Sequence, residues 1–275
     1  MRELPPGRPG MGYLGGVTVG EVVGGRFELL AEAGKGGMGS VYRAHDRRTG
    51  DLVAVKVLSD WGTDALPRFL REAEILAGIE HPGVVRYVAH GESGNGKAYL
   101  AMEWLEGEDL EQRLAREPLT VGEAVALAAR VADALAAAHQ RGIVHRDIKP
   151  SNLWLLRRRL DAVKVLDFGI ARVKSAPQAL TRTGVFMGTA AYMAPEQVRS
   201  ARDVGPAIDV FALGCVLYEC LVGEPPFTGE HLAAVLVKIL MEDPPSLDAR
   251  RRGVQRVIAG KWMFPRFLPG GISCG

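Results

Sequence analysis

The residues that could transfer a proton or bind a phosphate gather in one short stretch, residues 145–152, with the sequence HRDIKPSN. It holds a carboxylate at Asp147, an ammonium at Lys149 and an amide at Asn152, and the apolar run LWLL follows directly. A second acid, Asp167, opens the tripeptide DFG just after the β-like run VKVL. Together these residue types suit a reaction between a hydroxyl group and a phosphate. Asp147 could accept a hydroxyl proton, Lys149 could neutralise a phosphate, and the amide with the second acid could hold magnesium.

A glycine-rich segment lies upstream at residues 33–42, with the sequence AGKGGMGSVY and the pattern GxGxxG. Glycines let backbone amides approach phosphate oxygens closely. Dinucleotide-binding folds use the same pattern, but they need a helix directly after it. Here the strand-like VYRA continues the segment, and a second strand, LVAVKVL at 52–58, follows a turn. Lys56 lies inside that apolar strand, where a charge is costly to bury without a partner.

The motifs HRDxKxxN, DFG, GxGxxGxV, VAVK and the tripeptide APE at 194–196 occur together in this chain. They resemble the catalytic domain of bacterial serine/threonine protein kinases of the eukaryotic-like class, over about residues 26–246. The resemblance implies an α+β, two-lobed fold. A small antiparallel β-sheet N-lobe with one helix would occupy residues 26–104, and a mainly α-helical C-lobe residues 105–246.

The same resemblance implies transfer of the ATP γ-phosphoryl group to Ser or Thr hydroxyls of proteins, with Mg²⁺, or Mn²⁺ in its place. Asp147 would orient the hydroxyl and accept its proton, while Lys149 would offset charge on the migrating group. Asn152 and Asp167 would hold the metal, and Lys56 would hold the α- and β-phosphates. The remaining nucleotide contacts that it implies are Gly34, Lys35, Gly36, Gly37, Met38, Gly39, Val41, Ala54, Met102, Glu103, Leu105, Asp109 and Trp154.

Two of the implied acidic positions have alternatives. Glu72, near the centre of a helix predicted over residues 64–79, is expected to pair with Lys56 as in the family pattern. Glu74 competes for that role, but it points to another face of the helix and is expected to be a solvated charge. Asp109 falls where the family often places a ribose contact, and a helix-start acid explains it equally well.

The expected adenine pocket departs from the family pattern at two positions. Ala33 replaces a larger aliphatic roof, and Trp154 replaces an aliphatic floor. Met102 would be the gatekeeper, and the backbone of Glu103 and Leu105 would hydrogen-bond the adenine edge. Aromatic stacking on a purine face is favourable. The sequence therefore predicts altered inhibitor selectivity with ATP binding retained.

The segment between DFG and APE, residues 170–192, reads as a polar loop that is longer than ordinary connections. Thr181 and Thr183 lie where bacterial members of the family carry autophosphorylated threonines, although plain loop threonines are the alternative. Thr189 matches the substrate-binding segment, where it would bridge the catalytic aspartate and lysine. The resemblance also allows a homodimer for trans-autophosphorylation.

Two predicted helices lie before and after residues 145–152, the predicted catalytic stretch. TVGE at 120–123 is a capping box that opens an Ala-rich helix. Asp209 opens a nearly all-apolar helix and resembles the family residue that accepts hydrogen bonds from the catalytic-loop backbone. His139 is expected to be an ordinary surface or helix-end histidine. The ring of His145 is expected to pack beneath Phe168.

Composition limits the remaining function classes. The chain has 275 residues, 47% hydrophobic and 24% charged, which suits a globular protein with a full core. A net charge of +2 indicates no general nucleic-acid or membrane-surface role. No apolar run approaches the roughly 18–20 residues of a membrane span, and the start lacks a signal-peptide pattern, so a cytoplasmic location is expected.

The two ends of the sequence do not match the family. Residues 1–25, rich in Gly and Pro, are predicted to be a flexible leader. Residues 247–275 form a basic tail in which the last C-lobe helices are not recognisable. An altered reading frame or a truncated gene is the favoured explanation, and a docking segment is the other. The rival function is therefore a catalytically impaired, kinase-like nucleotide-binding or scaffold module.

Overall fold

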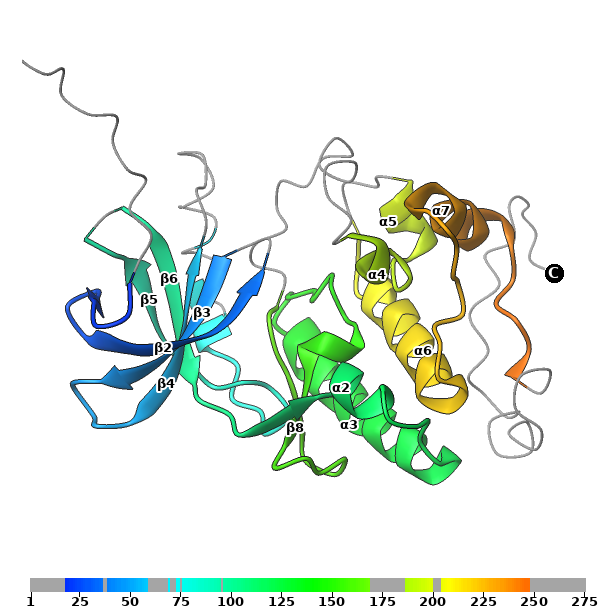
Figure 1. Cartoon of the computed structure of the whole chain (residues 1–275). Coiled ribbons are helices and arrows are strands. Elements are labelled where there is room, and N and C mark those ends of the chain that lie inside the picture. The colour runs from blue at the N-terminus through cyan, green and yellow to red at the C-terminus, as the bar shows by residue number, and fades with distance from the viewer. Residues whose placement is uncertain are drawn as a thin grey trace, which may run out of the picture. The chain divides into compact units, whose positions relative to one another are not determined.

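The computed structural model describes residues 18–36, 39–58, 69, 73–74, 76–94, 96–168, 186–199 and 204–247. Two compact units make up the chain (Figure 1). Unit 1 comprises Met1–Trp61 and Val88–Trp104, and unit 2 comprises Gly62–Tyr87 and Leu105–Gly275. Unit 1 contains the β-sheet that the sequence predicts for the smaller lobe, and the helices described below belong to unit 2.

The framework of unit 1 is a six-stranded sheet with the order β1-β2-β3-β4-β6-β5. The pairings of β1 with β2, β2 with β3, β3 with β4 and β4 with β6 are antiparallel. Side chains alternate across β4, so that Val53, Val55 and Val57 are buried. The strands are β1 (Val22–Val23), β2 (Phe27–Gly36), β3 (Gly39–Asp46), β4 (Leu52–Leu58), β5 (Tyr87–Glu92) and β6 (Ala98–Glu103).

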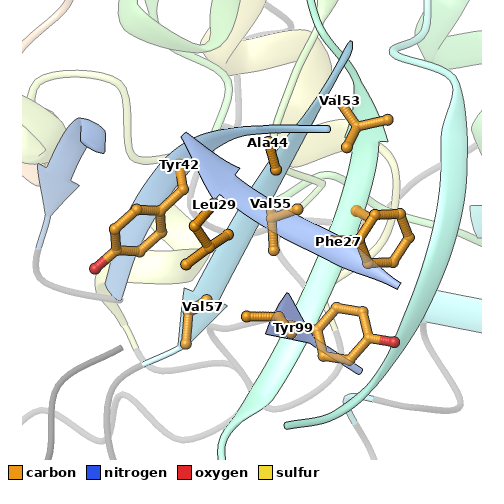
Figure 2. Packing of buried hydrophobic residues seen from close by; sticks show 10 residues of the cluster. Phe27, Leu29, Tyr42, Ala44, Val53, Val55, Val57 and Tyr99 are labelled. Carbon is orange, nitrogen blue, oxygen red and sulfur yellow. The ribbon is translucent and has the colours of Figure 1, made fainter. Parts of the chain in front are cut away.

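One apolar cluster fills the core of unit 1 (Figure 2). The rings of Phe27 and Tyr99 meet edge to face with centroids 5.8 Å apart. Beside them, Arg26 lies over Phe27 and binds Asp46 through two hydrogen bonds of 2.8 and 2.7 Å. Hydrogen bonding to this guanidinium holds the pKa of Asp46 at about 2, against the opposing effect of burial. The cluster consists of Val23, Phe27, Leu29, Tyr42, Ala44, Val53, Val55, Val57, Tyr99 and Ala101.

Unit 2 contains two long helices, α3 (Val121–His139) and α6 (Ala207–Val222), which contact each other. The predicted capping box opens α3: Glu123 N donates to the Thr120 hydroxyl at 3.3 Å, and Thr120 N donates to the Glu123 carboxylate at 2.9 Å. Helix α6 is apolar nearly all round and is buried along most of its length. It ends at Gly223, whose φ of +93° is the left-handed conformation that favours glycine at a helix end.

A small sheet with the order β7-β8-β9 follows residues 145–152 directly through β8 and leads toward Asp167 through β9. Both of its pairings are antiparallel, and Leu153 is opposite Val165 while Trp154 is opposite Lys164. The elements here are β7 (Gly107–Asp109), α2 (Leu110–Leu114), the 3₁₀ turn η1 (Pro150–Asn152), β8 (Leu153–Leu156) and β9 (Val163–Val165).

A third group of elements follows the DFG tripeptide: α4 (Phe186–Ala190), α5 (Pro195–Val198) and α7 (Leu232–Met241). Part of the segment predicted as loop is therefore helical, because α4, at residues 186–190, lies within its last third. The reason is packing, since Ala190 is fully buried in a cluster with Cys215, Phe227 and Val235. Among the residues that the structure describes, no helix is both long and apolar enough to cross a membrane.

Tyr192 and Glu219 form a hydrogen-bonded pair between the segment before α5 and helix α6. The phenol donates to the carboxylate at 2.5 Å. Burial raises the pKa of Glu219 to about 7, and the negative charge of Glu111 adds to the rise, whereas the hydrogen bond from Tyr192 opposes it. Burial also raises the pKa of Tyr192 and of the neighbouring Cys215 thiol, so the pair is neutral below pH 7.

The capping box should contribute measurably to stability. Replacing Thr120→Ala removes the hydroxyl that caps α3 and should lower the free energy of unfolding by about 1 kcal/mol. Thr120→Ser keeps the hydroxyl and should stay within a few tenths of a kcal/mol of the parent. Urea titration at pH 7 measures both. Equal stability of the alanine variant and the parent would show that the cap contributes nothing.

The raised pKa of Glu219 should make stability fall as pH rises. The folded protein keeps this proton up to about pH 7, whereas the unfolded chain releases it near pH 4.5. The free energy of unfolding therefore falls as the pH rises across that window. Glu219→Gln keeps an acceptor for Tyr192 but carries no proton to lose. Its stability relative to the parent should grow by about 2 to 3 kcal/mol between pH 4.5 and 7.5.

Urea titrations at several pH values measure this difference. The exposed Glu230 provides the matched control. Glu230→Gln should show a difference from the parent that does not vary with pH. A pH-independent difference for Glu219→Gln would contradict the prediction.

Candidate active site

Helix α6 holds the backbone of residues 145–152, the stretch that the sequence predicts to be catalytic. Asp209, fully buried in the first turn of α6, accepts hydrogen bonds from the backbone N–H of His145 at 2.7 Å and of Arg146 at 2.8 Å. The sequence predicted this role for Asp209. Arg146 has a φ of +66°, which is unfavourable for a residue with a side chain, so these bonds stabilise a strained conformation.

His139 has a role that the sequence analysis missed. It is the helix-end histidine that the sequence allowed and not a surface one, because its Nε2 lies 2.8 Å from Asp209 Oδ2 and only 17% of its side chain is exposed. His139 is the last residue of α3, and its partner lies 70 positions further along the chain. No local pattern marks such a long-range contact. The three donors together satisfy a buried carboxylate that would otherwise be costly.

His145 is a structural residue, as predicted. Its ring is completely buried and packs on Phe168 with centroids 4.7 Å apart. Asp147 N donates to Nδ1 at 3.2 Å, so the proton resides on Nε2, which donates to Leu166 O at 2.7 Å. Burial lowers the pKa of His145, which agrees with a neutral ring. This ring therefore joins the catalytic loop to the backbone just before Asp167.

The predicted catalytic residues form one hydrogen-bonded cluster. Lys149 Nζ lies 3.3 Å from Asp147 Oδ2 and 3.1 Å from Thr189 Oγ1. Asn152 Nδ2 donates to the backbone oxygen of Asp147 at 2.7 Å and to its Oδ2 at 3.2 Å. Thr189 thus reaches the aspartate through the lysine. The cluster combines a proton acceptor with a cation, and two of its members, Asp147 and Thr189, line a small pocket together with Arg146.

Asn152 and Asp167 could hold a metal ion. Both lie at one end of the β8–β9 hairpin, because Leu166 N donates to Asn152 O at 2.9 Å. The amide nitrogen of Asn152 is occupied by Asp147, which leaves the side-chain oxygen as the ligand atom. Asp167 has a φ of +51°, another strained backbone. One carboxylate and one amide oxygen suit Mg²⁺, which takes its remaining ligands from phosphates and water.

No group of three or more His, Cys, Asp or Glu side chains that could hold a metal occurs among the described residues. An all-protein cage of such ligands is therefore absent from that part of the chain. A site with few protein ligands depends on its substrate to complete the coordination.

In unit 1, the glycine-rich segment forms the β2–β3 hairpin. Gly34 pairs with Val41, and Gly36 pairs with Gly39. At Gly39, φ is +142° and an added Cβ would lie 2.1 Å from Val57 O, so only glycine fits. The hairpin continues into a strand, as predicted, and not into the helix that a dinucleotide-binding fold requires.

The other residues of unit 1 that the sequence predicts to contact the nucleotide lie on the same sheet. Val41 pairs with Lys56, and Ala54 pairs with Met102, so these side chains belong to adjoining rows on β3, β4 and β6. Lys56 is half-buried, whereas its neighbours along β4 are buried. Glu103 ends β6. The strand pairing therefore groups the residues that the sequence assigns to the nucleotide within this unit.

Two further positions lie on the small sheet of unit 2. Asp109 accepts a hydrogen bond from Gln112 N at 2.7 Å and so caps α2. This supports the helix-start explanation, and a ribose contact stays a prediction. Trp154 lies on β8, opposite Asp109 of β7. Its buried Nε1–H makes no hydrogen bond within the described part of the chain. Leu105 precedes β7 and is half-buried.

Several predicted site residues have little or no structural description. Lys35 lies on β2 with an exposed side chain. Glu74 is exposed, as expected for a solvated charge. Five of the residues assigned to the site lie outside the described residues, namely Gly37, Met38, Glu72, Thr181 and Thr183.

Comparison with known proteins identifies relatives that match most of this chain. Serine/threonine-protein kinase pkn3 of Myxococcus xanthus is 38% identical over 244 residues, 85% of this chain and 44% of the relative. PknB of Mycobacterium tuberculosis is 41% identical, covering 83% of this chain and 37% of the relative. PknA of the same organism is 43% identical, covering 83% and 54%. The chain thus spans about half the length, or less, of these curated relatives.

Solved structures and a family model agree with these relatives. The kinase domain of Mycobacterium tuberculosis PknI aligns with a TM-score of 0.68 at 29% identity, covering 88% of this chain and 87% of that one. The fold is therefore the two-lobed kinase fold that the sequence predicted. The family model described as protein kinase domain matches residues 27–251. With the match covering most of its length, this chain belongs to the protein kinase family, among relatives that are bacterial serine/threonine kinases.

Proposed function

We propose that this chain transfers the γ-phosphoryl group of ATP to serine and threonine hydroxyls of proteins. Membership of the protein kinase family implies the use of ATP and a divalent metal in general. The observation that carries the proposal is the cluster of Asp147, Lys149 and Asn152, bonded to one another. A backbone anchored on Asp209 supports this cluster. The three side chains supply the base, the cation and a metal ligand that the reaction needs.

The proposed step uses the chain's residues as follows. A substrate hydroxyl donates its hydrogen bond to Asp147, which accepts the proton as the oxygen attacks the γ-phosphorus. The bond to the β–γ bridging oxygen breaks and ADP leaves. Lys149, oriented by Thr189, offsets the charge on the migrating phosphoryl group. Mg²⁺ or Mn²⁺ would neutralise phosphate charge, with Asn152 and Asp167 as its ligands.

We also propose which residues of the chain contact ATP. The β2–β3 hairpin, with its glycines, suits backbone contacts to phosphates. We assign Lys56 to the α- and β-phosphates, and Glu72 to Lys56. Thr181 and Thr183 are proposed autophosphorylation sites, and a homodimer would serve that reaction in trans. The lysine at 149 and the names of the relatives favour Ser and Thr over Tyr as acceptors.

Asp147→Asn tests the proposal, because it removes the proton acceptor with little change of shape. Incorporation of ³²P from γ-labelled ATP into the chain itself and into a Ser/Thr-containing protein should fall by about 10²–10⁴-fold. Phosphoamino-acid analysis of the parent should find phosphoserine or phosphothreonine. The matched control is Asp161→Asn, an exposed acid on the β8–β9 turn, which should retain full activity.

Three results would contradict the proposal. Equal incorporation by the parent and Asp147→Asn would exclude a catalytic role for this acid. Phosphotyrosine alone would exclude the proposed substrate class. No incorporation by a folded parent that still binds ATP would favour a kinase-like binding module.

The indole of Trp154 should affect inhibitors more than ATP. If it forms the adenine floor, Trp154→Leu removes the aromatic face and should change the affinity of adenine-competitive inhibitors about 5-fold or more, with the KM for ATP changed less. Trp154→Phe is the matched variant. Because Nε1–H makes no hydrogen bond within the described chain, the phenyl ring should reproduce the parent. Unchanged inhibitor affinities in the leucine variant would exclude Trp154 from the pocket.

A further inference from the structure

Gln197, the third residue of α5, joins two backbone segments that are far apart in sequence. Its Oε1 accepts a hydrogen bond from Ala194 N at 2.9 Å, and its Nε2 donates to Arg146 O at 3.2 Å. The partners fix the orientation of the amide, because an N–H can only donate and a carbonyl can only accept. The side chain therefore ties the segment before α5 to the catalytic loop.

The carbonyl that Gln197 binds belongs to the peptide unit that leads into Asp147. That unit is planar, so the direction of the Arg146 carbonyl also sets the direction of the Asp147 N–H. The same N–H donates to His145 Nδ1 at 3.2 Å. On the other side of Arg146, its own N–H is held by Asp209 at 2.8 Å. Both peptide planes of this residue, whose φ is +66°, are thus fixed by side chains from other elements.

We infer that Gln197 is a positioning residue for the catalytic carboxylate of Asp147. It acts through the Arg146 carbonyl, and it connects the orientation of that carboxylate to the segment that contains Thr189 and Tyr192. These residues, together with Arg146, line one small pocket. The inference rests on the proposed phosphoryl transfer, in which Asp147 accepts the hydroxyl proton.

Two substitutions separate this role from simple capping of α5. Gln197→Leu removes both hydrogen bonds. Gln197→Glu keeps the acceptor for Ala194 N, but its ionised carboxylate repels the Arg146 carbonyl. When that carboxyl group is protonated, it can donate to the Arg146 carbonyl as the amide does. A lower pH should therefore restore the lost contact in Gln197→Glu alone.

The test measures kcat and the KM for ATP of the full chain from pH 5.5 to 7.5. At pH 7.5 both variants should lose about 10- to 100-fold in kcat, with the KM for ATP within about 3-fold, since misplacement of a catalytic group acts on the chemical step. The kcat of Gln197→Glu relative to the parent should rise between pH 7.5 and 5.5, by about 1.5-fold after a 10-fold loss and about 5-fold or more after a 100-fold loss, because its protonated fraction grows to about 6%. Gln197→Leu should show no such rise. Gln112→Leu, on the exposed surface of α2, should match the parent.

Hydrogen exchange gives a second readout that does not need activity. Amides of residues 145–149 should exchange faster in Gln197→Leu than in the parent, while those of α6 stay unchanged. A parent without activity would contradict the proposed function, and the exchange data alone would then decide the role of Gln197. An active parent with unchanged kcat in both variants would overturn the inference and leave the proposed function intact. Equal losses at every pH together with a lower melting temperature would show a merely structural residue.

Discussion

The site depends on one buried carboxylate, Asp209. With no exposed surface, it accepts hydrogen bonds from two consecutive backbone N–H groups, and it lies 2.8 Å from the His139 ring. A charge buried this deeply is tolerated only when its oxygens are satisfied. Its place in the first turn of α6 helps, because the positive end of the helix dipole favours an anion. A nearly all-apolar helix of unit 2 thereby fixes the polar stretch at residues 145–152.

Strained backbone occurs beside both acids of the site. Arg146, with a φ of +66°, precedes Asp147, and Asp167 itself has a φ of +51°. Each such conformation costs of order 1–3 kcal/mol and persists only where surrounding bonds determine it. The His145 ring makes one hydrogen bond beside each of these two positions. It accepts from Asp147 N, next to Arg146, and donates to Leu166 O, next to Asp167. One neutral ring therefore couples the two strained positions.

Local patterns in the sequence predicted much of this arrangement, and long-range contacts account for what they missed. The capping box at Thr120 and the strand around Lys56 depend on residues a few positions apart, so spacing and alternation revealed them. His139 and Gln197 bind partners 70 and 51 positions away, and nothing near them in the chain signals it. Helix α4, with the short sequence FMGTA, was missed because burial of Ala190 against α6 and α7 favours it, and those partners are distant in the sequence.

Two contacts of different kinds join residues 189–197 to the proposed catalytic loop at residues 145–152. Thr189 bonds the side chain of Lys149, and Gln197 bonds the backbone of Arg146. The first orients the cation, whereas the second orients the peptide that carries the base, so a displaced segment would disturb both groups together. A single hydrogen bond contributes about 0.5–1.5 kcal/mol net. Two of them bias the loop by about 1–3 kcal/mol, which corresponds to roughly a 5- to 150-fold change in the population of the aligned loop.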